Sequence, residues 1–414
     1  MTNLSRKSFA KQISFGLLAL VAFVVTPTFT GQLEAEDVDV LDTFATNNVA
    51  VAGQFAFAAA GSQGLVIVDL SVPEIAGVIA PPGATGSIDD VSIDGDLLFS
   101  LDASDDFFQA ASDGGALSVF SIANPMQPTL VSGPITVGVS PFAGVSAANQ
   151  RVVVSGGTGL LSERSYAING TLAASASTID LGVGQPDVLV AEDGETAFVS
   201  TDFSGFFDGQ SFGITTVNIA GPNLSILDRI GIVGAGFSAG FAKPANFPIE
   251  SAQSGDTLYV ASGNGVSVFD VSNPSSVQTL ALIPLNTNPV NIDVVGNTLY
   301  VVGNSPTPTL TTIDVSVLSS PVVDTTVLPT GSNPLSVAAT STSVVIADSN
   351  LGILVETLLL PGDVNQDGAV DFLDISPFIG ILSVGGVQAE ADIDGSGAVN
   401  FLDISPFIEI LSGN

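Results

Sequence analysis

Two stretches of the sequence repeat one spacing of oxygen-bearing side chains, from Asp363 to Asp374 and from Asp392 to Asp403. A hard cation such as Ca²⁺ takes about six to eight oxygen ligands, and a twelve-residue loop supplies them from positions 1, 3, 5, 7, 9 and 12, with glycine at position 6. Both stretches have that glycine, so we expect two structural Ca²⁺ ions. The expected ligands are Asp363, Asn365, Asp367, the carbonyl of Ala369, Asp371 and Asp374 in the first loop and Asp392, Asp394, Ser396, the carbonyl of Ala398, Asn400 and Asp403 in the second.

The two loops differ in charge. Among these ligands the first loop has four carboxylates and the second has three. Because the charge of the ligands tunes calcium affinity, the sequence predicts weaker binding in the second loop.

Each loop ends in aspartate and is followed by one short apolar segment, residues 375–382 or residues 404–411. The general EF-hand pattern has glutamate at the last position. The shorter carboxylate, the single helix after each loop and the tandem arrangement make residues 361–414 resemble a type I dockerin. The resemblance implies a small α-helical domain with two calcium loops, which binds a cohesin domain on a scaffold or cell-surface protein.

The same resemblance implies which side chains contact that partner. They are Phe372, Leu373, Ser376, Phe401, Leu402 and Ser405. Two features depart from the family pattern. A Phe-Leu pair replaces the usual polar pair, and Pro377 and Pro406 lie where a helix interior would lose a hydrogen bond and bend. The expected partner is a cohesin-like or other surface protein; self-association through the two similar halves is the alternative.

The start of the sequence has the pattern of a secretory signal peptide. Three basic residues precede an apolar run from Ile13 to Val25, which is too short for a membrane span of about 20 residues. We expect a signal peptide over residues 1–30, with cleavage between about 30 and 35, and no membrane span afterwards. The mature protein would be secreted, extracellular or on the cell surface, with the periplasm as a further location and an uncleaved anchor as the alternative.

Composition excludes several classes of function. All 41 acidic residues lie beyond Leu33, whereas three of the seven basic residues precede it. Nucleic acid and anionic membranes are poor partners for such a chain, because both attract positive charge. The sequence contains no His, Cys or Trp, which removes His-based catalysis, thiolate nucleophiles and disulfides.

Only carboxylates remain for an enzymatic reaction. Acids cluster at Asp89, Asp90, Asp94, Asp96, Asp102, Asp105 and Asp106. A pair of carboxylates about 5–10 Å apart can hydrolyse a glycosidic bond. A polysaccharide-degrading glycoside hydrolase is therefore the alternative function, although solvated turns between strands account for the same acids. A minor calcium loop around Asp102 is a further interpretation.

Residues 36–360 are predicted to be an all-β domain. Short runs rich in Val, Ile, Leu, Phe and Thr alternate with Gly, Asn, Asp and Pro, and no long amphipathic helix is apparent. Seven copies of one unit follow one another between Gly53 and Ser341. Because a four-stranded propeller blade takes about 40–45 residues plus loops, we expect a seven-bladed β-propeller.

Individual repeats carry a recognisable sequence. Leu65-Val-Ile-Val-Asp69 and Val266-Ser-Val-Phe-Asp270 resemble the LVIVD repeat, a family of secreted and surface β-propellers. A pair of β-sandwiches or a β-solenoid is the alternative fold.

The seventh unit supplies only three strands before the dockerin-like segment begins. A strand-like run over residues 38–44 precedes the first unit and could complete the seventh blade. Such pairing would join the ends of the ring and cover an edge that otherwise invites aggregation.

The sequence therefore predicts an exported interaction protein rather than an enzyme. The propeller would present a binding surface, and the C-terminal module would tether it to an extracellular assembly.

Overall fold

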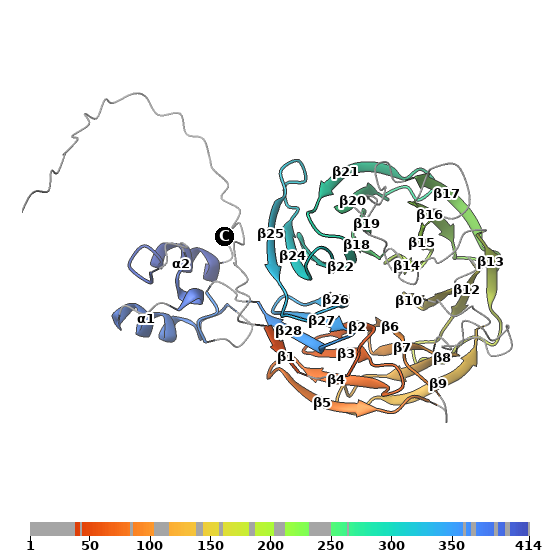
Figure 1. Ribbon diagram of the computed structural model, residues 1–414, viewed down its shortest axis with the longest axis horizontal. Helices are drawn as coiled ribbons and strands as arrows, with labels where there is room; N and C mark the ends of the chain where they lie inside the picture. The colour runs from red at the N-terminus through yellow and green to blue at the C-terminus, as the bar shows by residue number, and fades with distance from the viewer. Residues whose placement is uncertain are drawn as a thin grey trace, which may run out of the picture. The chain divides into compact units, whose positions relative to one another are not determined.

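A computed structural model of the protein describes residues 38–41, 44–82, 86–102, 116–137, 144–156, 160–181, 187–202, 212–231, 250–262, 265–358, 362–365, 370–384, 388–393 and 398–412. The predicted signal peptide lies outside these residues. Within them, 28 strands form seven antiparallel sheets of four strands each (Figure 1).

The blades follow one another along the chain. The first contains β2 (Asn48–Ala52), β3 (Phe55–Ala59), β4 (Leu65–Asp69) and β5 (Glu74–Ile79). The second contains β6 (Asp90–Asp94), β7 (Leu97–Asp102), β8 (Ala116–Ser121) and β9 (Thr129–Thr136). The third contains β10 (Gly144–Ala148), β11 (Arg151–Ser155), β12 (Leu160–Ser165) and β13 (Ser177–Asp180). The fourth contains β14 (Asp187–Val190), β15 (Thr196–Asp202), β16 (Phe212–Asn218) and β17 (Ser225–Gly231).

The remaining blades repeat this order. The fifth contains β18 (Ser251–Ser254), β19 (Thr257–Ser262), β20 (Gly265–Asp270) and β21 (Gln278–Pro284). The sixth contains β22 (Pro289–Val295), β23 (Thr298–Gly303), β24 (Thr309–Asp314) and β25 (Val322–Val327). The seventh contains β26 (Pro334–Ala339), β27 (Ser343–Asp348), β28 (Gly352–Thr357) and β1 (Val38–Val40).

The seven sheets are the blades of a closed ring (Figure 1). The first strand of each blade lies innermost and contacts the innermost strand of the next blade, from β2 and β6 through to β22 and β26. A last contact between β26 and β2 closes the ring. The predicted seven-bladed β-propeller is therefore confirmed.

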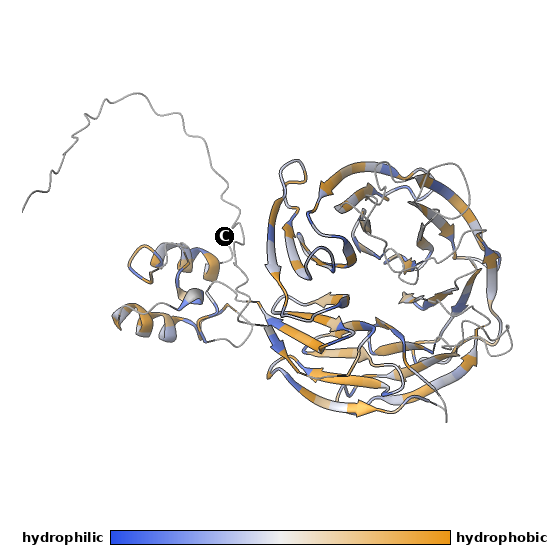
Figure 2. Ribbon diagram, viewed as in Figure 1, coloured by the Kyte–Doolittle hydropathy of each residue, from blue (hydrophilic) through white to orange (hydrophobic). Residues whose placement is uncertain are grey.

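The strand β4 shows why the repeats read as continuous apolar runs. Leu65 and Ile67 pack toward the second blade in a cluster with Leu98, whereas Val66 packs toward the seventh blade in a cluster with Val345. Both faces of the sheet are thus buried between neighbouring blades, so the first four positions of the strand are apolar. Figure 2 shows the resulting hydrophobic residues along the strands of the propeller.

Glycine begins the third strand of several repeats for a steric reason. Gly64 and Gly265 have φ angles of +98° and +146°, which residues with a side chain rarely adopt. A Cβ atom would also lie 2.0 Å from the carbonyl oxygen of Ile79 or Ile283, respectively, on the adjacent fourth strand. Only glycine permits the fourth strand to pair this closely.

The ring is closed by the first described strand of the chain. β1 pairs antiparallel with β28 and becomes the fourth strand of the seventh blade. Thr46 follows it and is fully buried; its hydroxyl donates to Gly352 O at 2.6 Å and accepts from Asp348 N at 2.9 Å. The prediction that residues 38–44 complete this blade is confirmed, with a strand that ends earlier, at Val40.

The C-terminal segment contains α1 (Ile375–Val384), the short 3-10 helix η1 (Ala389–Ala391) and α2 (Ile404–Ser412). Its core consists of Val364, Phe378, Ala391, Val399 and Phe407. The rings of Phe378 and Phe407 stack with centroids 4.2 Å apart, which joins the two halves. No helix in the described residues is long and apolar enough to cross a membrane.

The helices accommodate both prolines without losing a hydrogen bond. The helix containing Pro377 begins at Ile375, and the first four N–H groups of a helix have no intrahelical acceptor. The first such bond comes from the next residue, since Phe378 N donates to Asp374 O at 2.9 Å. Pro406 has the same position in α2. The predicted loss of a hydrogen bond is wrong, because both prolines lie in the first turn.

Candidate calcium and docking site

The structure describes eight of the twelve predicted calcium ligands. These are Asp363, Asn365, Asp371, Asp374, Asp392, Ala398, Asn400 and Asp403. The other four, Asp367, Ala369, Asp394 and Ser396, lie outside the described residues.

The last aspartate of each loop is fully buried at the start of a helix. Asp374 accepts hydrogen bonds from Asn365 N at 3.0 Å and Asp371 N at 2.8 Å, so its carboxylate joins the beginning of the first loop to its end. Asp403 accepts from Asn400 N at 2.7 Å in the second loop. These bonds fix the orientation of the position-12 carboxylates.

The residues at position 9 hold the turn that leads into each helix. Asp371 Oδ1 accepts from Leu373 N at 2.6 Å, and Asn400 Oδ1 accepts from Leu402 N at 2.9 Å. Asn400 also donates to the carbonyl of Ala398 at 2.8 Å. The turn at position 9 is therefore the same in both loops, although one uses a carboxylate and the other an amide.

The chemistry of these groups fits a hard divalent cation. Residues 361–414 contain nine acidic side chains and no lysine or arginine, and Asp363, Asp374 and Asp403 are buried. Buried carboxylates require compensation by a cation or by hydrogen bonds, and oxygen-only ligands suit Ca²⁺. Among the described residues no three acidic side chains form a metal-binding group, and the missing members of each loop fall outside that part of the chain.

The side chains predicted to contact a partner are exposed in both halves. Phe372 and Phe401 are 79% and 80% exposed, and their neighbours Leu373 and Leu402 are 65% and 69% exposed. Ser376 and Ser405 are exposed as well. Large apolar side chains that are this exposed, at matching positions in both halves, indicate an interaction surface.

The sequence analysis missed two members of this surface. Ile379 and Ile408 are each 57% exposed on α1 and α2. The signal was present, because each isoleucine lies three residues after an exposed serine and such residues share a helix face. We call Phe372, Leu373, Ile379, Phe401, Leu402 and Ile408 the apolar docking surface.

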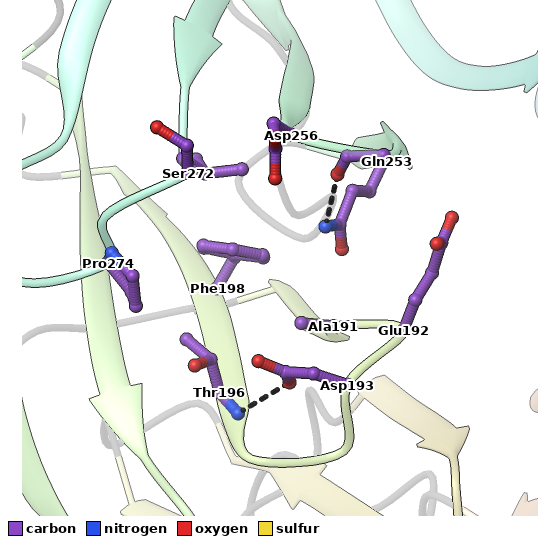
Figure 3. A pocket seen from close by; sticks show the side chains of 11 residues that line it. Ala191, Glu192, Asp193, Thr196, Phe198, Gln253, Asp256, Ser272 and Pro274 are labelled. Atoms are coloured by element: carbon purple, nitrogen blue, oxygen red, sulfur yellow. Dashed lines mark hydrogen bonds between the residues drawn. The ribbon is translucent and has the colours of Figure 1, made fainter.

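A pocket of about 230 Å³ lies between the fourth and fifth blades (Figure 3). Figure 3 shows the carboxylates of Asp193 and Asp256 on opposite sides of Phe198, while Glu192 points away from them. Asp193 holds its own turn by accepting from Thr196 N at 3.1 Å. The pocket therefore offers negative charge and hydrogen-bond acceptors. The sequence analysis did not predict it, although acids in the turns of two successive repeats were a signal.

Among the described residues, the acids that the sequence offers as candidate catalytic residues make different contacts. Asp89 and Asp102 both accept from the hydroxyl of Ser87. Asp90 lies across the boundary to the third blade, where its Oδ2 accepts from Val145 N at 2.7 Å. Burial, followed by the charges of Asp187 and Asp89, raises the pKa of Asp90 from 3.8 to about 7, although the bond from Val145 N opposes the shift.

Asp94 contacts a different group from the other acids. Its carboxylate accepts from the hydroxyl of Tyr166 in the third blade. Burial and this bond raise the pKa of Tyr166 far above its ordinary value. The contacts of Asp90 and Asp94 join neighbouring blades, whereas Ser87 binds Asp89 and Asp102 at the second blade.

Comparisons with known families match both parts of the chain. Residues 361–412 match the model of the dockerin type I domain, and residues 45–74 and 252–281 match the LVIVD repeat. The predicted LVIVD repeats and C-terminal dockerin domain are confirmed. Type I dockerin domains bind calcium and cohesin partners and are usually extracellular. No curated protein matches the chain.

Several solved structures share the fold at low identity. Hydrazine synthase of Kuenenia stuttgartiensis is 14% identical over 82% of this chain and 99% of its own, with a TM-score of 0.55. U3-55K is 12% identical over 79% of this chain and 100% of its own, with a TM-score of 0.54. Virginiamycin B lyase from Staphylococcus aureus is 10% identical over 78% of this chain and 98% of its own, with a TM-score of 0.51. At this identity the likeness concerns the fold alone.

Proposed function

We propose that this chain, a seven-bladed propeller with LVIVD repeats and a C-terminal type I dockerin domain, is an exported interaction protein without enzymatic activity. In this proposal the dockerin domain tethers the protein to an extracellular or cell-surface assembly, and the propeller presents a binding surface. The observation that carries the proposal is the apolar docking surface, which repeats the same exposed residues in both halves of the dockerin domain.

Two calcium ions would hold this domain in its folded form, one in each loop. The residues described above that would hold them are Asp363, Asn365, Asp371 and Asp374 in the first loop and Asp392, the carbonyl of Ala398, Asn400 and Asp403 in the second. A bound ion supplies positive charge to a segment that has no basic side chain. The position-12 carboxylates would then fix the start of each helix and the exposed pair just before it.

The proposed partner is a cohesin-like surface protein with apolar residues at its contact. Full burial of one phenylalanine or leucine contributes about 1.5–3 kcal/mol, so the two Phe-Leu pairs can supply most of the binding energy. Ser376 and Ser405 would lie beside this apolar centre and donate or accept hydrogen bonds. The strong negative charge around the surface favours a partner with basic residues at the rim of its contact.

A binding experiment with the full chain tests this proposal. Purified cohesin domains are immobilised, and the chain is passed over them with calcium or with a chelator. We expect capture only with calcium. A variant with Phe372, Leu373, Phe401 and Leu402 all changed to serine should lose at least about tenfold in affinity, because a loss of about 1.4 kcal/mol alone produces that factor.

The control variant is Val72→Ser, which removes a 61% exposed apolar side chain from the propeller. It should bind as the unmodified chain does. Equal capture of the fourfold variant, with calcium binding retained, would refute the role of the docking surface.

Export and the absence of catalysis are separate parts of the proposal. N-terminal sequencing of secreted protein tests cleavage between about 30 and 35. The alternative, a glycoside hydrolase, remains a prediction and is tested by assaying the full chain on polysaccharides with Asp90→Asn as the comparison. Hydrolysis that this variant abolishes would replace the proposed function with the alternative.

A further inference from the structure

Oxygen atoms from three blades converge beside one glycine at the innermost strands of the ring. Asp90, Gly144 and Asp187 begin β6, β10 and β14, respectively. The position that a Cβ of Gly144 would occupy has three oxygens as its nearest neighbours: Ser155 Oγ at 3.3 Å, Asp187 Oδ1 at 3.5 Å and Asp90 Oδ2 at 3.7 Å. The glycine thus leaves a small space that is bounded by two carboxylates and a hydroxyl.

A buried hydroxyl lies on the same face of the fourth blade as Asp187. Ser200 is fully buried and its Oγ has no hydrogen-bond partner. It lies directly opposite Asp187 in the ladder between β14 and β15, and directly opposed residues of antiparallel strands place their side chains on the same face. A buried polar group without a partner is costly, so its presence beside a carboxylate indicates that a further group completes the site.

The arginines of the described residues make contacts of their own. Arg151 binds Glu163 at 2.7 Å, and Arg164 and Arg229 donate to backbone carbonyls. Asp90 is surrounded by like charge, since Asp187 and Asp89 both raise its pKa after the larger effect of burial. A cation between the carboxylates would remove this repulsion.

We propose that Asp90, Ser155 and Asp187 bind a divalent cation that links the second, third and fourth blades. The ligands are all oxygens, which selects a hard cation such as Ca²⁺ or Mg²⁺. Ca²⁺ accepts irregular geometry more readily than Mg²⁺, and these oxygens come from three separate strands. Water would complete the coordination shell.

The sixth blade provides a matched variant. Asn291 Oδ1 accepts from Val337 N at 3.0 Å, just as Asp90 Oδ2 accepts from Val145 N at 2.7 Å. An asparagine, Asn291, therefore already makes the equivalent bond between two other blades of this propeller. Asp90→Asn should keep the bond between the blades while it removes one charged ligand.

The test is a calorimetric calcium titration of the full metal-free chain. We expect three ions for the unmodified chain, two for Asp90→Asn and three for the control Asn291→Asp. Asp187→Asn should also reduce the number to two, which provides a second variant if Asp90→Asn does not fold.

An equal number of ions for the unmodified chain and a folded Asp90→Asn variant would overturn this proposal. Failure of the dockerin loops gives a different result, because the unmodified chain would then bind one ion and Asp90→Asn none. The titration therefore separates this site from the two calcium loops.

Discussion

At the residue scale, Asp90 and Asn291 meet the same requirement with different chemistry. Each accepts a backbone N–H from the innermost strand of the next blade and so links two blades through a single side chain. The neutral amide of Asn291 makes this bond without burying a charge. The carboxylate lies among other acids, and burial makes its charged form unfavourable.

This difference predicts a pH dependence of stability in metal-free protein. The pKa of Asp90 is about 7 in the folded state against 3.8 ordinarily, so between these values the folded state holds a proton that the unfolded state has lost. The free energy of unfolding from this group therefore falls as the pH rises from about 4 to 7, by about 1.4 kcal/mol for each pKa unit.

Urea unfolding in a chelator, measured across this pH range, checks the effect. Asp90→Asn should flatten the decrease and be the more stable protein at neutral pH. A variant with the same slope as the unmodified chain would contradict the prediction.

The calcium loops permit a second prediction about single residues. Asp374 and Asp403 are fully buried and organise their loops by accepting backbone N–H groups. Asp374→Asn should abolish the tighter site and Asp403→Asn the weaker one, with at least a severalfold difference in affinity between the two sites because the first loop carries more carboxylates. Calorimetry measures both.

A control for these loop variants is Glu409→Gln, which removes an exposed acid from α2 and should leave both sites unchanged. Indistinguishable affinities in the two single-site variants would show that ligand charge does not rank the loops.

At the scale of elements, the closure of the ring depends on one side chain as well as on a strand. Thr46 lies beyond β1 and bonds to the backbone of β27 and β28 through its hydroxyl. Thr46→Val keeps the shape but leaves a buried N–H and C=O unsatisfied, which costs about 1–3 kcal/mol for each group.

Chemical unfolding should therefore show a clear loss of stability for Thr46→Val. Thr46→Ser retains the hydroxyl and should lose less. If serine and valine were equally destabilising, the hydroxyl would not matter and the lost packing of the methyl group would explain both.

Sequence reasoning succeeded for elements that are specified locally. The dockerin domain follows from a duplicated twelve-residue spacing, and β4 and β20 follow from short apolar runs before Asp69 and Asp270. The closure by β1 could also be predicted, because a seventh repeat with three strands leaves one edge open. The first turn of α1 was misjudged, since the position of Pro377 within the helix depends on where the loop ends.

Contacts between blades were beyond this reasoning. Asp90 and Val145 are 55 residues apart, and the spacing of the acids in one repeat does not show which backbone group of the next repeat they face. The pocket around Phe198 likewise exists only where two blades meet. The exposure of Ile379 depends on which face of α1 packs against Phe407.

At the scale of the whole molecule, the dockerin domain should depend on calcium for folding while the propeller does not. The dockerin core contains few fully buried side chains, and its segment carries nine acids without a basic residue. Small domains with so little buried surface often require a metal to fold. A chelator should remove the helical signal in circular dichroism.

The propeller should still unfold cooperatively in the chelator, because seven large apolar clusters stabilise it independently of the loops. Calorimetry should show its transition shifted only by the contribution of the site at Asp90. Loss of both transitions together would contradict a two-part molecule.

The pairing of β1 with β28 also sets an order of events during folding. The hydroxyl of Thr46 must find a backbone group 302 residues further along the chain, so the first strand to be synthesised waits unpaired until the last blade exists. Closing so long a loop is entropically costly and contacts of this separation form late. An exported chain that crosses a membrane from its N-terminus would therefore remain an open ring until almost all of the propeller has emerged, and only then become resistant to proteases.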